Sequence, residues 1–125
     1  MIKIVNLSGE EINEDLIRKA IETTLKEEES QIFPSVAIVN SEEIRKLNFQ
    51  YRKLDKPTDV LSFAEDINEI VICPEEVRKN GDDFNKELKE VAIHGVLHLL
   101  GYDHENSESE AKEMFNKQNK YLKIN

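Results

Sequence analysis

The three histidines of the chain lie within eleven residues of one another, at positions 94, 98 and 104. His94 and His98 are four residues apart, so on a helix they lie about 40° apart and one turn from each other, and both rings can reach one ion. Gly101 stands where that helix is expected to end, and glycine accepts the left-handed backbone that turns the chain back. This spacing predicts a metal site made by His94, His98 and His104.

Three neutral imidazoles are typical of catalytic zinc sites, in which the fourth coordination position stays open to water. Such a water has its pKa lowered to about 7 and becomes a nucleophile at neutral pH. A closed structural site would normally add a fourth Cys or His, and the sequence has no further histidine. We predict one Zn²⁺ ion per chain, at a site that also accepts nickel or copper in vitro.

The single cysteine, Cys73, has no internal partner for a disulfide, which fits a reducing compartment. It follows an apolar run and is expected to be a small buried side chain rather than a ligand. The longest apolar runs are far shorter than a membrane span. We therefore expect a soluble, cytoplasmic protein without a membrane partner.

The net charge of −9 argues against binding nucleic acid through bulk positive charge. The local charge differs in one segment, where five basic residues surround only Asp55. This segment is either a basic patch on an acidic body or a solvated charged turn. Its basic residues are Arg45, Lys46, Arg52, Lys53 and Lys56.

Hydrophobic periodicity predicts strands and helices in alternation along the chain. Strands are expected over 2–7, 35–40, 60–63 and 69–73, with an acidic turn over 64–68. Helices are expected from Asn13 to about 28, from a Ser41 cap to 51, over 83–100 and after a Ser107 cap. The closing helix is expected to turn an inner stripe toward the core, made by Ala111, Met114, Phe115, Gln118 and Leu122.

This order of elements indicates one α+β domain over residues 1–125, with a mixed four-stranded sheet covered by helices. The helix over 83–100 is apolar on most sides in its second half, so it is expected to be the buried central helix. The metal site would then lie where this metal-binding helix meets the edge of the sheet.

The histidine spacing coincides with the metzincin protease pattern H-E-x-x-H-x-x-G-x-x-H, which makes the central helix zincin-like. The one departure is Gly95, which stands where those proteases carry the glutamate that acts as general base. Peptide hydrolysis would need that base from elsewhere in the chain.

The segment from His94 to His104 also resembles the signature of the YbeY family of metal-dependent endoribonucleases. Upstream blocks are similar to that family in order and spacing: Leu47 to Arg52, Asp55 to Phe63, and Ile70 to Pro74. The resemblance implies zinc-dependent cleavage of single-stranded RNA in ribosomal RNA maturation and ribosome quality control. It further implies ribosomal small-subunit components as partners and a functional role for the family arginine, which falls on Arg52.

A guanidinium presents paired donors to phosphate oxygens, so Arg52 is the predicted catalytic residue that holds the scissile phosphate. Lys53 and Lys56 are predicted to follow the neighbouring RNA backbone. Two alternative functions remain. One is a noncatalytic ribosome-assembly factor with a structural metal, and the other, less favoured by the sequence, is a metalloprotease-like hydrolase.

The chain departs from the family pattern at two places. Ala64 stands where the family usually has proline, and Asn68-Glu69 where it commonly has Gly-Asp. Three carboxylates remain candidates for orienting a metal-bound imidazole, namely Glu69, Glu90 and Asp103.

Overall fold

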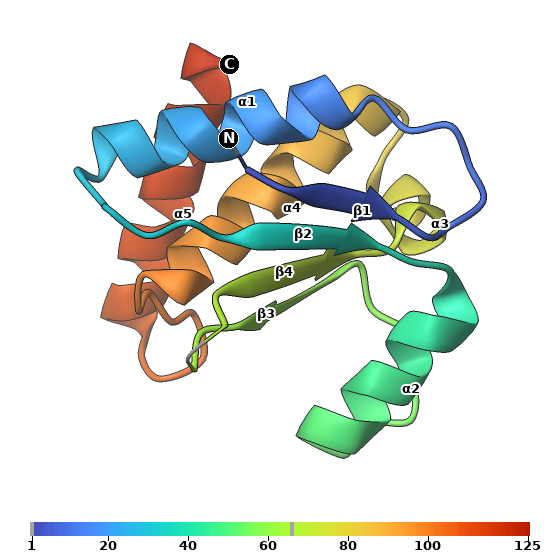
Figure 1. The fold of residues 1–125 in the computed structure, drawn as a ribbon. Coiled ribbons are helices and arrows are strands. Elements are labelled where there is room, and N and C mark those ends of the chain that lie inside the picture. Colours follow the sequence, from blue (N-terminus) through green and yellow to red (C-terminus); the bar gives the residue numbers. More distant parts are fainter. Residues whose placement is uncertain (1, 66) are drawn as a thin grey trace.

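The computed structural model describes residues 2–65 and 67–125, in which four strands form one sheet in the order β1-β2-β4-β3 (Figure 1). The strands are β1 (Ile4–Asn6), β2 (Ser35–Ile38), β3 (Val60–Phe63) and β4 (Glu69–Ile72). The helices are α1 (Glu14–Glu27), α2 (Ser41–Arg52), α3 (Pro74–Val77), the short 3-10 turn η1 (Arg78–Asn80), α4 (Phe84–Leu99) and α5 (Glu108–Ile124).

The sheet is mixed, as the order of elements predicted. β1, β2 and β4 run parallel, and the helices α1 and α2 lie in the connections between them. β3 returns antiparallel to β4, with Leu61 opposite Val71. An α+β fold with a mixed four-stranded sheet is therefore confirmed, and β3 is an edge strand of that sheet.

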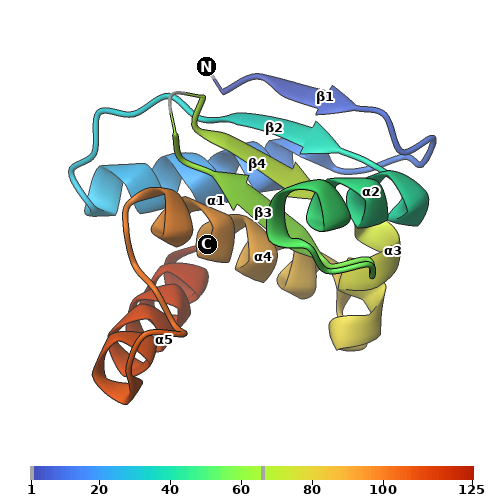
Figure 2. The same cartoon turned by 90° about the horizontal axis from the view of Figure 1, so that it is seen from below.

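The two faces of the sheet pack against different helices, because successive side chains of a strand point to opposite sides. Ile70 and Ile72 join the larger core cluster with residues of α1, α4 and α5. Val71, between them, joins a smaller cluster with Leu61 and with Ile44 of α2. Figures 1 and 2 show α2 set apart from the other long helices. The central helix α4 is thus enclosed by β3, β4, α1 and α5.

The helix starts follow from side-chain caps. Asn13 Oδ1 accepts a hydrogen bond from Leu16 N at 3.2 Å, and Ser107 Oγ accepts one from Glu110 N at 3.1 Å, as the sequence predicted. The predicted Ser41 cap is wrong. Asn40 has the extended backbone of a cap and its Oδ1 accepts from the N–H three residues on, at 2.9 Å, so Ser41 is the first helical residue.

The inner stripe of α5 also differs from its prediction. Met114, Gln118 and Tyr121 are its buried residues, whereas Phe115 is 59% exposed. The stripe follows the i, i+4, i+7 spacing of one helix face. Phe115 follows Met114 directly, so it is turned by about 100° from it around the helix and lies outside the buried face. Tyr121 is therefore the buried residue of the last turns, next to the predicted Leu122, which is only partly buried.

The turn between β3 and β4 is only partly described, because Asp66 lies outside the described residues. At its end, Asn68 has a left-handed backbone with φ 45°. Asparagine tolerates this conformation better than most residues with a side chain, so the turn is formed without glycine at position 68.

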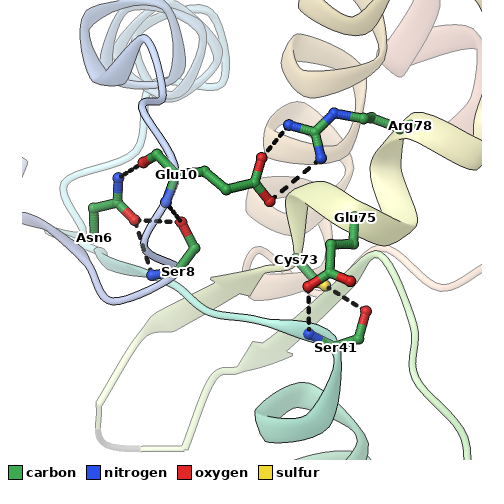
Figure 3. Close-up of polar contacts among 7 residues, drawn as sticks. All are labelled: Asn6, Ser8, Glu10, Ser41, Cys73, Glu75 and Arg78. Carbon is green, nitrogen blue, oxygen red and sulfur yellow. Dashed lines mark hydrogen bonds and ion pairs between the residues drawn. The ribbon is translucent and has the colours of Figure 1, made fainter.

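Polar contacts hold the loop after β1 and the start of α3 (Figure 3). Arg78 pairs with Glu10, and Ser41 N donates to Glu75 Oε1 at 3.3 Å. Cys73 is fully buried beside Ser41, with 3.6 Å between Sγ and Oγ, so it is the small core residue that was expected. Within the described ranges, no helix has the length and apolar character to cross a membrane.

Candidate metal centre

Two of the three histidines lie one turn apart on α4 and turn their rings toward each other. The Nε2 atoms of His94 and His98 are 3.1 Å apart, and the ring centroids are 4.6 Å apart. Two nitrogens that bind one tetrahedral zinc ion at 2.0–2.1 Å are about 3.3 Å apart. The helical spacing therefore brings the two donor atoms to the separation that one ion requires.

The third histidine is brought in by the loop that ends α4. Gly101 has φ 98°, and the N–H groups of Gly101 and Tyr102 donate to the carbonyls of His98 and Leu97 at 3.1 and 3.0 Å. This is the glycine-terminated helix end that the sequence predicted. The ring of His104 then lies 5.2 Å and 5.0 Å, between centroids, from the rings of the two helical histidines.

One nitrogen of each ring lies within 4.8 Å of the other two, so His94, His98 and His104 can hold one metal ion. His104 is the most exposed of the three and lies on the loop. Zinc-bound nitrogens are about 3.3 Å apart, so no pair of donors needs to approach by more than about 1.5 Å to complete a zinc site. The donor set therefore fits a zinc ion.

A buried glutamine from α5 fixes the orientation of His94. Gln118 Oε1 lies 2.8 Å from His94 Nδ1, and Gln118 Nε2 donates to Glu90 Oε1 at 3.1 Å. Because a carboxylate only accepts, Glu90 takes the amide N–H and leaves the amide oxygen to accept from His94. His94 Nδ1 thus carries the proton, and Nε2 faces the other two rings with a free lone pair.

Burial keeps the two helical imidazoles neutral. Desolvation lowers the pKa of His94, although its hydrogen bond to Gln118 acts in the opposite direction. Desolvation and the neighbouring rings of His94 and His104 lower the pKa of His98 to about 4. Neutral imidazole is the form that binds a metal, so these two donors are ready to bind at neutral pH.

Gly95 lies where α4 meets the sheet, between the two helical histidines. A Cβ at this position would lie 2.9 Å from Ile70 Cγ2 and 3.3 Å from Ser62 Oγ. Ser62 Oγ also donates to the Gly95 carbonyl at 3.0 Å. The close contact between helix and sheet requires glycine, and it leaves no room for the glutamate of the metzincin pattern.

A second polar cluster anchors the loop that carries His104. Tyr102 donates to Glu28 Oε1 at 2.7 Å, and Tyr121 and Lys117 of α5 both bind Glu28 Oε2. Burial alone would raise the pKa of Glu28, but hydrogen bonds from Tyr102, Tyr121 and Lys117 outweigh it, so the pKa is lowered. The ionised Glu28 therefore joins the end of α1 to the loop that carries His104 and to α5.

The histidines lie at a cavity of about 710 Å³ that also extends along β3 and reaches the last turn of α2. Arg52 lines this cavity, and its guanidinium is 3.5 Å from Glu105 Oε1, which is in turn 3.9 Å from His104 Nε2. Lys53 and Lys56 are exposed beside it but do not line the described part of the cavity. The fold thus brings Arg52 to the histidines and leaves the two lysines outside.

The basic segment is partly neutralised by its own neighbours. Arg45 pairs with Asp55 at 3.4 Å, and Lys46 pairs with Glu42 at 3.9 Å. These two cations therefore face acidic partners on α2 and the loop that follows it. The other basic residues of the segment are Arg52, Lys53 and Lys56.

The candidate carboxylates have separate places. Glu90 acts on His94 through Gln118, as described above. Asp103 lines the cavity and accepts from Glu105 N at 2.7 Å, which shapes the loop. Glu69 instead accepts from Ser35 Oγ at 3.4 Å. Gln118 itself was not found from the sequence as a partner of the site, although a glutamine between Met114 and Tyr121 on an apolar face signals a buried polar contact.

Comparisons with known proteins agree over nearly the whole chain. The sequence pattern described as "Endoribonuclease YbeY" matches residues 3–125. A Thermotoga maritima protein named Endoribonuclease YbeY is 45% identical over 98% of this chain and 87% of its own length. An Acinetobacter baumannii protein of the same name is 40% identical over 83% of this chain and 78% of its own length.

A solved structure gives the same result for the fold. The solution structure of a Thermotoga maritima protein matches with a TM-score of 0.67 and 41% sequence identity, covering 98% of this chain and 87% of that one. The match over residues 3–125, together with these relatives, shows that the chain belongs to the YbeY family of endoribonucleases.

Proposed function

We propose that this protein is a zinc-dependent endoribonuclease that cleaves single-stranded RNA during ribosomal RNA maturation and quality control, with residues 1–125 acting as one domain. The observation that carries the proposal is the convergence of three imidazole donors at a cavity that Arg52 also lines. The relatives named endoribonucleases supply the substrate class. We further propose a zincin-like metal helix, a cytoplasmic location and docking to components of the small ribosomal subunit.

His94, His98 and His104 would hold the ion. When bound, zinc at this site acts as a Lewis acid toward a phosphoryl oxygen and lowers the pKa of a water molecule. The residues around it keep the donors in place: Gln118 sets the ring of His94, and the loop after Gly101 brings His104 into reach. We propose zinc because three imidazoles with an open position are its usual catalytic donor set.

Arg52 would bind the scissile phosphate. Its side chain is 47% exposed, and its pair with Glu105 is a long surface contact that contributes at most about 1 kcal/mol. A phosphate offers the guanidinium two charged oxygens, which bind it more strongly than this single carboxylate oxygen. An RNA phosphate would therefore displace Glu105 and bring the phosphodiester next to the histidines.

Lys53 and Lys56 would act at longer range. Both are exposed, one at the left-handed end of α2 and one in the loop held by Asn48 Nδ2, which donates to the Lys56 carbonyl at 2.9 Å. Their charges would follow the RNA backbone as it leaves the cavity, without direct contact to the reacting phosphate. In this arrangement the cavity selects the RNA segment that is cleaved, and the two lysines outside it add affinity for the RNA backbone.

Two variants test this function. His98→Ala is expected to lose both bound zinc and RNA cleavage, whereas Arg52→Ala is expected to keep zinc and lose cleavage. Zinc is measured by elemental analysis of protein without a histidine tag, and cleavage with a fluorescently quenched single-stranded RNA. Full cleavage by zinc-free His98→Ala protein would refute the proposed mechanism. Intact RNA after hours with zinc-loaded parent protein would favour the noncatalytic assembly factor.

A further inference from the structure

The cavity that begins at the histidines ends in an apolar region on the side of α2. Tyr51 and Phe63 line this end, and their ring centroids are 4.9 Å apart at an interplanar angle of 63°. Tyr51 is 58% exposed, and Ile67, which lines the same cavity, is 60% exposed. Large apolar side chains that stay open to solvent at the rim of a cavity mark a binding surface.

The two rings come from different elements, α2 and β3, which pack on the same smaller core cluster. Tyr51 lies in the last turn of α2, and Phe63 ends β3, where it packs on the smaller core cluster with Leu47 and Leu61. Phe63 is therefore held in place by the core cluster, and its ring makes an edge-to-face contact with the more exposed Tyr51. The pair therefore forms one aromatic surface built from two elements.

This surface lies next to Arg52, the residue proposed to bind the scissile phosphate. Arg52 follows Tyr51 directly in the sequence, and both line the same cavity. A nucleotide carries the same pair of groups, a charged phosphate and a neutral ring with an aromatic face. Unpaired bases bind proteins by stacking on aromatic side chains, and every base offers such a face.

We propose that Tyr51 and Phe63 form a nucleobase subsite, which stacks one unpaired base of the RNA whose adjacent phosphate is held by Arg52. The proposal rests on the proposed function. It gives the enzyme a physical reason to select single-stranded RNA, because a base in a duplex is already paired and stacked. Base identity matters little, since the subsite reads the face of the ring.

Binding is measured with zinc-loaded protein and two nuclease-resistant 2'-O-methyl phosphorothioate oligonucleotides of equal length. One carries bases, and in the other every base is replaced by hydrogen. The ratio of the two dissociation constants is the base preference, which a contact to the backbone alone does not change. Stacking of one base on an aromatic side chain predicts a preference of roughly five- to 150-fold.

Tyr51→Ala is expected to abolish the base preference while zinc content and thermal unfolding stay as in the parent. Tyr51→Phe keeps the ring and is expected to keep the preference, and Phe63→Leu is expected to reduce it without leaving a large cavity. The matched control is Phe49→Ala. Phe49 is an aromatic residue of the same helix with a similar exposure of 54% that does not line the described cavity.

Unchanged base preference in folded, zinc-loaded Tyr51→Ala would overturn the subsite, as would an equal loss in Phe49→Ala. If the parent still cleaves single-stranded RNA in that case, the proposed function stands without the subsite. If the parent neither binds nor cleaves RNA, both fall together. Arg52→Ala is expected to weaken binding of both oligonucleotides by the same factor, which separates the phosphate contact from the base contact.

Discussion

Gln118 is the residue whose role in the metal centre can be tested most directly. The variant Gln118→Met keeps nearly the same side-chain length and removes the oxygen that accepts from His94 Nδ1. Because Gln118 is 8% exposed, water has little access to replace it. The His94 ring then loses its anchor and its preferred tautomer.

The expected effect follows from that one contact. Leaving a buried donor without a partner costs about 1–3 kcal/mol. Loss of a partner that orients a metal-bound histidine typically weakens metal affinity by roughly 10- to 100-fold, which is about 1.4–2.7 kcal/mol. The two estimates overlap, so we expect the zinc dissociation constant of Gln118→Met to rise by about 10- to 100-fold.

The assay is competition for zinc against a chromophoric chelator, with thermal unfolding of the metal-free protein measured in parallel. Gln31→Met is the matched control, since Gln31 is exposed between α1 and β2. The exchange of Gln118→Glu with Glu90→Gln restores an acceptor toward His94 and a donor behind it, and is expected to recover most of the affinity. Parent-like zinc affinity in Gln118→Met would refute the reasoning, as would an equal loss in Gln31→Met.

Three further predictions concern the surroundings of the site. Gly95→Ala is expected to lower the free energy of unfolding by about 1–3 kcal/mol, measured by urea denaturation, because the added methyl group meets Ile70. The metal-free protein is expected to lose stability as the pH falls from 6.5 to about 4, because the unfolded chain protonates His98 before the folded one does; denaturation in chelator at a series of pH values measures this. Glu28→Ala is expected to cost about 2 kcal/mol or more of stability and to weaken zinc binding, measured as for Gln118, because Tyr102 loses its acceptor.

Each of these has an outcome that contradicts it. Parent-like stability of Gly95→Ala would mean that helix and sheet can separate at no cost, and Gly81→Ala serves as the comparison outside the site. A metal-free protein equally stable at pH 7 and pH 4.5 would contradict the lowered pKa of His98. Zinc affinity unchanged in Glu28→Ala, at a temperature where the variant is folded, would show that the loop holds His104 without its anchor.

The sequence was sufficient for the features that depend on local spacing. The i, i+4 placement of His94 and His98 determines their approach on α4, and Gly101 adopts the backbone that its position required. The strand order was not determined in the same way, but the sequence of elements restricted the sheet to a mixed one. The cap of α2 was misplaced by one residue because Asn40 and Ser41 are both good caps and only the backbone decides between them.

The contacts between distant segments could not be predicted. Gln118 lies 24 residues from His94, and Glu28 lies 74 residues from Tyr102. Periodicity tells which face of α5 is buried only approximately, so the predicted stripe included the exposed Phe115 and named Leu122 in place of the buried Tyr121. The role of a buried polar residue depends on which atoms the packing brings beside it, and this depends on the whole fold.

The three histidines are divided between a helix and an anchored loop, and we expect this division to set how quickly a bound ion can exchange. His94 and His98 lie one turn apart on α4, whereas His104 lies on the loop and is more exposed, so we expect release of a bound ion to begin at His104. Opening that segment breaks the contact of Tyr102 with Glu28, which joins the loop to α1 and α5. We therefore expect the dissociation rate of a bound ion to depend on helices whose residues do not touch it, so that metal retention can change without a change of ligand.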